Sequence, residues 1–299
     1  MDNTKRAPVA VGGVGGSGTR FIAHILQHFG YYIGNDLNRA IDNLWFTLLF
    51  KRTEILSISE QEFSELCDIF LKRMTGQIID NPKDQELVKN ICYVNRKIIV
   101  KNLLKRFKRH FSDKSGSIAW QKRRAEILLL DKYKKSKKPR WGWKEPNTHI
   151  IIDRLKSNIP NLKYIHVIRN GLDMAFNNNQ NQLQFWGHHF FGSKFELSPH
   201  YSLKYWCLAN KKAIEFCNKD ADNFLLFRYD DLFSNPEKVI IKLLVFLDIK
   251  IDDSKILDIV KLIHKSKSVN IHKNHDLSQF DTSDLKYVKK LGFEINKLR

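Results

Sequence analysis

The sequence has few cysteines and no long apolar run. Its four cysteines are Cys67, Cys92, Cys207 and Cys217. They form neither a C-x-x-C pair nor a cluster with histidine, so they are expected to be small buried hydrophobes in a reducing compartment. The apolar stretch at 44–50 is far shorter than the roughly 18 residues needed to span a bilayer, and residues 1–8 lack the apolar core of a signal peptide. A cytoplasmic protein without a transmembrane segment is expected, and peripheral contact with a membrane surface is left open.

Acidic residues are outnumbered by basic ones. There are 32 Asp and Glu against 51 Lys and Arg, which gives a formal net charge of +19. This excess suits an anionic cofactor, an anionic acceptor, nucleic acid or a membrane surface. It is equally consistent with lysine that only covers the surface, because the chain is also rich in Ile and Asn. With 299 residues and 42% hydrophobic content, residues 1–299 are expected to form one globular domain.

A glycine-rich turn follows the first apolar run. Its glycines lie between a predicted strand at 8–13 and a helical pattern at 19–29, and they are Gly12, Gly13, Gly15, Gly16 and Gly18. A turn of this kind at a helix N-terminus directs backbone N–H groups at one anion, and Ser17 and Thr19 add hydroxyl donors. Thr19 stands where a nucleotide-triphosphate loop has lysine, so the turn departs from that motif. The alternative is a plain connection between a strand and a helix.

Strand and helix patterns alternate along the chain. Further buried strands are predicted at 163–170 and 223–229, with a short one at 31–34. The segment GNDLN is expected to turn into a helix that runs through about residue 52, and residues 45–140 are interpreted as a helical, basic insertion. The pattern predicts an α/β fold, in which a P-loop-like parallel sheet is flanked by helices. Ligands of such sheets bind beyond the carboxyl ends of the strands, where the glycine turn lies.

Residues 141–182 hold a second group of polar side chains. Lys144 precedes a helix that Pro146 opens, Arg169 ends a strand, and Asp173 falls in the first turn of the next helix. A cation at a strand end beside a helix N-terminus is well placed to bind a second phosphate. The alternative is that Arg169 and Asp173 form a structural ion pair.

Together these segments resemble the sulfotransferases that use 3′-phosphoadenosine 5′-phosphosulfate (PAPS). VGGVGGSGTR is similar to the family's 5′-phosphosulfate turn, YIHVIRNGLDMAFN to its 3′-phosphate motif, and RYDDLFSNPEKV to a downstream strand–helix segment. The resemblance implies that the cofactor is bound by Gly15, Gly16, Ser17, Gly18, Thr19, Arg20, Arg169, Asn177 and Tyr229. In this set Arg169 and Asn177 would hold the 3′-phosphate, and Tyr229 would lie near the nucleotide.

The segments WKEPN and GND are most like the protein-tyrosine branch of that family. This resemblance implies that Lys144 lies near the transferred group and that Asp36 is the base that takes the acceptor proton. Gly16 stands where the family usually has lysine or arginine, so Arg20 or Lys144 would have to supply the charge. Asp36 is equally suited to cap the helix that follows it. Other candidates for the base are three histidines, of which the first and last are expected to be packed: His24, His149 and His166.

The resemblance implies transfer of a sulfonate from PAPS to a hydroxyl or amine of an unidentified acceptor, with 3′,5′-ADP as product. Sulfonyl transfer should proceed by in-line displacement, as phosphoryl transfer does. No metal is expected, because a sulfonyl group carries less charge than a phosphoryl group. The acceptor would be a small molecule, a carbohydrate or a peptide, and no nucleic acid is expected. The alternatives are a P-loop kinase of a small hydroxylated substrate and a non-enzymatic nucleic-acid-binding protein. Residues 127–131 imitate the metal-binding strand of a kinase, but they are better interpreted as part of a basic helix.

Overall fold

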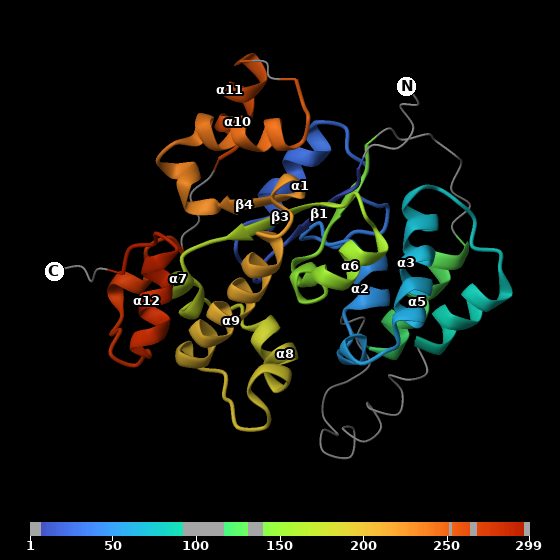
Figure 1. The fold of residues 1–299 in the computed structure, drawn as a ribbon, viewed down its shortest axis with the longest axis horizontal. Coiled ribbons are helices and arrows are strands. Elements are labelled where there is room, and N and C mark those ends of the chain that lie inside the picture. The colour runs from blue at the N-terminus through green and yellow to red at the C-terminus, as the bar shows by residue number, and fades with distance from the viewer. Residues whose placement is uncertain (1–6, 92–116, 131–139, 251–252, 264–267, 296–299) are drawn as a thin grey trace.

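A sheet of four parallel strands lies at the centre of the fold (Figure 1). The computed structural model describes residues 7–91, 117–130, 140–250, 253–263 and 268–295. The strands run in the order β2-β1-β3-β4 and are β1 (Val9–Gly12), β2 (Gly142–Lys144), β3 (Lys163–Ile168) and β4 (Phe224–Arg228). Parallel strands that are covered on both faces are nearly continuous apolar runs, which is the pattern of β1 and β3. The predicted α/β fold, with a parallel sheet flanked by helices, is confirmed.

Three of the four strands match the sequence predictions to within two residues. The exception is β2, which is too short to give a strand pattern of its own. Its Gly142 approaches β1 so closely that a Cβ there would lie 2.1 Å from the carbonyl oxygen of Val9. Glycine at this position lets β2 pair with β1, and the pairing brings Lys144 to the carboxyl end of the sheet.

The chain that follows the first helix folds differently from the prediction. The strand expected at 31–34 is reduced to an isolated bridge. The helix begins only with α2 (Leu44–Phe50), and its N-cap Asn43 accepts a hydrogen bond of 2.9 Å from the first turn. The interpretation of Asp36 as a helix cap is therefore wrong. Residues 34–43 form a loop instead of a helical turn.

Helices cover both faces of the sheet, because successive residues of a strand point to opposite sides. On one face, Val9 and Val11 share an apolar cluster with α1 (Thr19–His28), α10 (Pro236–Phe246) and α11 (Asp253–Lys261). On the other face, Ala10 shares a cluster with α2, α3 (Glu60–Met74), α5 (Ile118–Leu130), α6 (Ile152–Asn158), α7 (Gly171–Ala175), α8 (Asn181–Phe191), α9 (Pro199–Cys217) and α12 (Thr282–Lys290). Shorter helical turns are η1 (Thr53–Leu56), η2 (Pro146–Ile150), η3 (Ala221–Asn223), η4 (Tyr229–Phe233) and η5 (Ile271–Asn274).

The chain between α1 and β2 supplies helices that pack against β2. Phe46 of α2 stacks on Trp143, with ring centroids 5.7 Å apart, and Phe70 of α3 meets the same indole edge-on at 5.2 Å. α5 ends at Leu130, so residues 127–130 are helical, and the interpretation of this stretch as a helix is confirmed. Aromatic packing of this kind adds specific geometry to the burial of apolar area.

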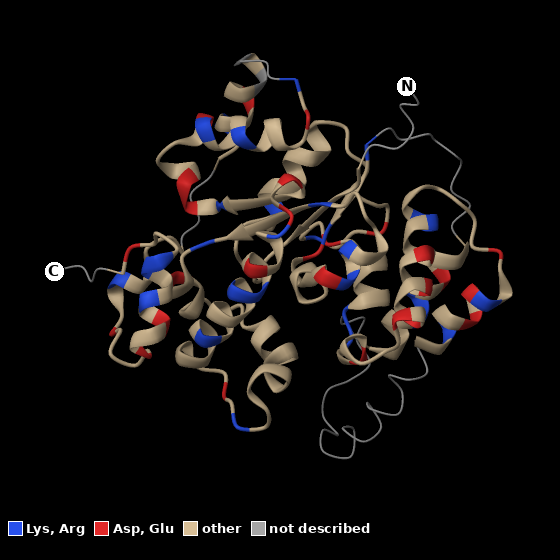
Figure 2. Ribbon diagram, in the orientation of Figure 1, with Lys and Arg blue, Asp and Glu red and all other residues tan. Residues whose placement is uncertain are grey.

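Charged residues of both signs share the outer helices. Figure 2 shows Lys and Arg together with Asp and Glu on α3, α5 and α12. In the described part of the chain, positive charge is thus spread among acidic residues, which favours the interpretation that lysine covers the surface. Among the described helices, none has the length and apolar character needed to cross a bilayer.

The cysteines that the structure describes are free and buried. They are Cys67, Cys207 and Cys217, whereas Cys92 lies outside the described residues. Burial raises the pKa of Cys67 and of Cys217 to about 12. These thiols therefore stay protonated and act as small packing groups, as predicted.

Candidate active site

A cavity of about 620 Å³ lies at the carboxyl ends of β1, β2 and β3. Its volume falls within the range of small-molecule sites, roughly 300–1,000 Å³. Nearly all predicted site residues line it: Gly15, Gly16, Gly18, Thr19, Arg20, Lys144, Arg169, Asn177 and Tyr229. Ser17 and Asp36 do not line it. The fold therefore brings together side chains from distant parts of the chain at the edge where parallel sheets bind ligands.

The glycine turn has the backbone that an anion site needs. Gly18 is the N-cap of α1 with a φ of 101°, and Gly16 has a φ of 96°, a region that only glycine enters without strain. A Cβ on Gly18 would also lie 2.2 Å from the ring of Tyr229. The first N–H groups of α1 have no partner inside the helix, and the helix dipole adds positive potential at the same end.

Contacts beneath the turn hold its shape. Oε1 of Gln182 accepts a hydrogen bond from the N–H of Gly15 at 3.0 Å, and its Nε2 donates to the carbonyl oxygen of Gly13 at 3.4 Å. Ser17 is buried, and its N–H donates to the carbonyl oxygen of Val14 at 3.1 Å. The Ser17 hydroxyl has no hydrogen-bond partner among the described residues. Its side chain therefore lies under the turn and not in the cavity wall.

Arg169 follows β3 and is almost fully buried, with 3% of its surface exposed. Its Nη2 lies 3.8 Å from Oδ2 of Asp173, so the expected ion pair exists but is long. Asp173 is instead hydrogen-bonded by the N–H of Asn270 at 2.8 Å and by Nδ1 of His272 at 2.6 Å. Nε and Nη2 of Arg169 have no hydrogen-bond partner within the described ranges. A buried guanidinium with unused donors is suited to an anionic ligand.

Asn177 and Tyr229 line the same cavity as Arg169. Oδ1 of Asn177 accepts a hydrogen bond from the N–H of Asn179 at 2.9 Å, which leaves the amide nitrogen as the donor. The guanidinium carbon of Arg169 lies 5.9 Å from the ring centroid of Tyr229, within reach of a cation–π contact. Burial raises the pKa of Tyr229, so the phenol stays neutral. These residues offer hydrogen-bond donors and one aromatic ring to a ligand.

Lys144 ends β2 with only 3% of its side chain exposed. Its Nζ forms an ion pair with Asp42 and donates to the carbonyl oxygen of Ala40 at 3.1 Å. Both partners belong to the loop 34–43 and line the cavity. Burial raises the pKa of the adjacent Glu145, and the negative charge of Asp42 acts in the same direction. Lys144 is thus a buried cation that two acceptors hold at the cavity wall.

The other candidates for the base lie in different environments. Asp36 pairs with Arg124 of α5, outside the cavity wall. His24 is exposed and lines the cavity, so the packing expected at this position is wrong. His149 and His166 are buried, and burial lowers the pKa of His149 to about 3 and that of His166 to about 4. Both buried histidines are therefore neutral near pH 7.

A family model described as the sulfotransferase family matches residues 8–253. This range contains the glycine turn, Lys144 and Arg169. The chain belongs to the sulfotransferase family. Membership favours sulfonyl transfer over the kinase and over the nucleic-acid-binding protein that the sequence left open.

Solved structures of other sulfotransferases are similar to this one. The sulfotransferase domain of the Synechococcus PCC 7002 olefin synthase is 15% identical, with a TM-score of 0.48 over 99% of this chain and 98% of that chain. The sulfotransferase domain from the curacin biosynthetic pathway is 14% identical, with a TM-score of 0.47 over 98% and 99% of the two chains. A sulfotransferase from Alicyclobacillus acidocaldarius is 12% identical, with a TM-score of 0.44 over 99% and 98%. No curated protein sequence matches this chain.

The cavity of this sulfotransferase includes residues that sequence motifs did not reveal. They include polar and apolar side chains: Asp42, Asn179, Ser268, Leu232, Leu262 and Ile263. Asp42 carries no local signal, because its partner Lys144 is 102 positions further along the chain. Asn179 does have a local signal, since it lies two residues after Asn177 in an asparagine-rich run.

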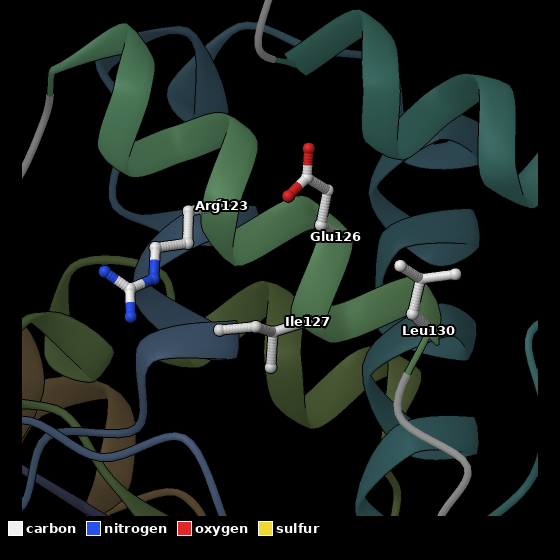
Figure 3. Close-up of a pocket in the computed structure, with 4 residues that line it drawn as sticks. All are labelled: Arg123, Glu126, Ile127 and Leu130. Atoms are coloured by element: carbon white, nitrogen blue, oxygen red, sulfur yellow. The ribbon is translucent and has the colours of Figure 1, made fainter.

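A second hollow of about 510 Å³ lies on α5 (Figure 3). Its lining residues come from one face of this helix and are Arg123, Glu126, Ile127 and Leu130. No described residue of another element contributes to its wall. Among the described residues, its wall therefore lacks polar groups that converge from several elements, as they do in a small-molecule site, and we assign no function to it.

Proposed function

We propose that this protein transfers the sulfonate of PAPS to a hydroxyl, or an amine, of an acceptor and releases 3′,5′-ADP. One observation carries the proposal: two buried cations, Arg169 and Lys144, line the same cavity as a glycine turn at a helix N-terminus. PAPS has two separate anionic groups, a 3′-phosphate and a 5′-phosphosulfate, which match two separate cations. Membership of the sulfotransferase family supports the same chemistry.

The chain offers a distinct set of groups to each end of the nucleotide. The unused Nε and Nη2 of Arg169 and the amide nitrogen of Asn177 would hold the 3′-phosphate, while Tyr229 would lie beside the nucleotide. The N–H groups of the glycine turn would hold the 5′-phosphosulfate, as helix N-termini commonly do with phosphate. The N–H groups that we propose for this second group are those of Gly16, Gly18, Thr19 and Arg20. Gly15 and Ser17, whose N–H groups are bound to Gln182 and to Val14, would shape the turn.

Sulfonyl transfer depends mostly on position and electrostatics, so the placement of charge is the main catalytic contribution of the protein. Lys144 would neutralise the negative charge that develops on the bridging oxygen as the sulfur–oxygen bond breaks. Gly16 has no side chain for this role, and the exposed Arg20 would contact the phosphate. Asp36, the base that the family resemblance implies, would have to leave Arg124 before it could take a proton in the cavity.

We further propose that the acceptor is a small molecule, a carbohydrate or a peptide, that transfer needs no metal, and that the chain works as one cytoplasmic domain. The single domain is supported by a shared core, because Trp45 and Phe70 of the stretch 45–140 belong to the same apolar cluster as Trp143 of β2. The cytoplasmic location is supported by the buried free thiols. No nucleic-acid partner is proposed, and peripheral contact with a membrane is left open.

Binding of 3′,5′-ADP tests the proposal. The melting temperature should rise with 3′,5′-ADP in the absence of magnesium, because a ligand that binds only the folded state stabilises it. 5′-AMP is the control, since it lacks the 3′-phosphate proposed for Arg169, and it should stabilise much less. Equal stabilisation by 5′-AMP would contradict the proposal. Stabilisation by ATP with magnesium, but not by 3′,5′-ADP, would instead favour a kinase.

Transfer itself is tested with radiolabelled PAPS and a panel of acceptors. Phenols, sugars and tyrosine-containing peptides represent the three proposed acceptor classes. Label that passes from PAPS to a member of one class would support sulfonyl transfer and identify the acceptor class. Binding of 3′,5′-ADP without transfer to any acceptor or to water would contradict an enzymatic role.

A further inference from the structure

Two carboxylates of the loop 34–43 are candidates for the proton acceptor, and they lie in different places. Asp36 is paired with Arg124 of α5 and does not line the cavity. Asp42 lines the cavity, with 18% of its side chain exposed, and is paired with Lys144. A general base has to reach the proton that it takes, and in this fold only Asp42 of the two meets that condition.

Asn38 holds Asp42 in place within the loop. Oδ1 of Asn38 accepts hydrogen bonds from the N–H groups of Ala40 at 2.8 Å and of Asp42 at 2.9 Å. Its Nδ2 donates to Oδ2 of Asp42 at 2.8 Å. One oxygen of the carboxylate is therefore bound to Asn38, and the other faces Lys144. The carboxylate is fixed in direction, as a group that acts on a bound substrate has to be.

Ile41 stores backbone strain at the same point. Its φ is 64°, in the left-handed region that a β-branched residue rarely enters. A conformation of this kind costs on the order of 1–3 kcal/mol and is found where the surrounding structure requires it, often at functional sites. Here the strained residue lies between Ala40 and Asp42, the two groups that bind the ammonium of Lys144. The loop is thus bent so that a carbonyl and a carboxylate meet one lysine.

We propose that Asp42 is the catalytic base of this sulfotransferase, an inference that rests on the proposed function. As the acceptor oxygen forms a bond to sulfur, the bond between sulfur and the bridging oxygen of the 5′-phosphate breaks. The proton of the acceptor hydroxyl passes to a carboxylate oxygen of Asp42, and the electron pair of the broken bond stays on the phosphate oxygen beside Lys144. Protonation of Asp42 also weakens its attraction for Lys144, so the ammonium becomes available to the leaving group as charge develops there.

The charged and titratable groups that share the cavity with Asp42 come from several elements besides its own loop, among them Arg169 after β3 and Tyr229 in η4. Lys144 ends β2 and is followed by the buried Glu145, while α1 contributes Arg20 and His24 to the same cavity. A change in rate can therefore be assigned to Asp42 only by comparison with variants of other groups.

The test uses PAPS with water as the acceptor, so that no identified acceptor is needed. Asp42→Asn should slow the release of sulfate at least ~10²-fold, the lower end of what a general base contributes. The asparagine oxygen still accepts a hydrogen bond from Lys144, so the lysine keeps its place. The same variant should bind 3′,5′-ADP at least as tightly as the wild type, because a negative charge near an anionic ligand has been removed.

The matched control is Asp248→Asn, which disrupts an exposed ion pair with Lys163 outside the cavity wall and should keep the wild-type rate. A wild-type rate in Asp42→Asn would overturn the assignment, and so would a loss of rate confined to Asp36→Asn. Parallel loss of rate and of 3′,5′-ADP binding in Asp42→Asn would show that Asp42 only maintains the loop, which also overturns it. A wild type that neither binds 3′,5′-ADP nor cleaves PAPS would overturn the proposed function itself.

Discussion

The two buried cations of the cavity are held in contrasting ways. Arg169 lies directly after β3, near a carboxylate four residues further on, and its Nε and Nη2 are unused in the described structure. Lys144 is bound by Ala40 and Asp42, which are 104 and 102 positions away in the chain. Arg169 therefore has donors that no described residue uses, whereas the ammonium of Lys144 is already bound to two acceptors. Under the proposed function, Arg169 would bind the nucleotide as it stands, and the ion pair of Lys144 would have to rearrange when the cofactor binds.

Backbone strain follows the same division. Beside Lys144 the residue with positive φ is Ile41, for which this conformation is costly. The non-glycine residue with positive φ that contacts Asp173, the neighbour of Arg169, is Asn270, which has a φ of 67° and whose N–H donates to Asp173. Asparagine enters the left-handed region readily because its short side chain bonds locally. Strain is thus concentrated at the end where we propose the chemical step.

Acid should have the largest effect, because unfolding of the protein abolishes the Arg169 end and the Lys144 end of the cavity together. His166 on β3 and His149 in η2 are buried, with pKa values lowered to about 4 and about 3 by burial. In the unfolded chain both pKa values return to about 6.5. At a pH between the folded and the unfolded pKa values, the unfolded state therefore binds more protons than the folded state. The free energy of unfolding should therefore fall as the pH is lowered from about 6.5, by up to about 2.8 kcal/mol per pH unit for two protons.

Urea unfolding from about pH 4 to about pH 7 measures this dependence on pH. His166→Gln removes one titrating group and should reduce the slope by about one proton, whatever it does to the stability at neutral pH. An unchanged slope in this variant would mean that His166 is not the buried neutral group that the structure indicates.

Lys144→Ala should have the next largest effect and should act on turnover. Loss of a cation that faces developing charge costs ~10²-fold or more, the scale found for one oxyanion donor. The measurement is the release of sulfate from PAPS, with Lys163→Ala as the matched control, since that lysine pairs with Asp248 away from the cavity. Full turnover in Lys144→Ala would mean that the leaving group is stabilised from elsewhere, and the contrast between the two ends would disappear.

Arg169→Ala should act on binding instead. Its affinity for 3′,5′-ADP should fall roughly 10- to 150-fold, the equivalent of about 1.5–3 kcal/mol for a hydrogen bond to a charged group. The affinity for 5′-AMP should hardly change, because that nucleotide lacks the 3′-phosphate. Calorimetric titration of both nucleotides checks this. If Arg169→Ala binds 3′,5′-ADP normally, the arginine is only the structural partner of Asp173.

Arg20→Ala should have the smallest effect. Its side chain is exposed at the cavity rim, where water screens a charge–charge contact, so a loss of about fivefold or less in nucleotide affinity is expected. Turnover at saturating PAPS should stay close to that of the wild type. A large drop in turnover would place Arg20, and not Lys144, at the transferred group.

Local sequence patterns predicted the Arg169 end of the cavity well and the Lys144 end poorly. The strand before Arg169 and the helix after the glycine turn are visible in the sequence as apolar periodicity. The turn itself is visible as glycines at positions where φ is positive. The part of the loop 34–43 that follows Asp36 is predicted from the sequence to be helical, and Asp36 belongs to a segment that resembles a family motif. Nothing local marks Asp42, since its contact is with a lysine on β2, 102 positions further along the chain. The roles of all these residues in binding and catalysis are still predictions.

The sequence by itself determined the sulfotransferase resemblance, three strands of the sheet and the glycine turn, because apolar periodicity and backbone preference act over a few neighbouring residues. The tertiary structure decided that β2 joins the sheet, that Gln182 holds the turn from α8, and that Asp42 meets Lys144. Contacts between residues a hundred positions apart depend on how the whole chain packs. The ion pair at the proposed centre of the reaction is therefore a property of the fold and not of any motif.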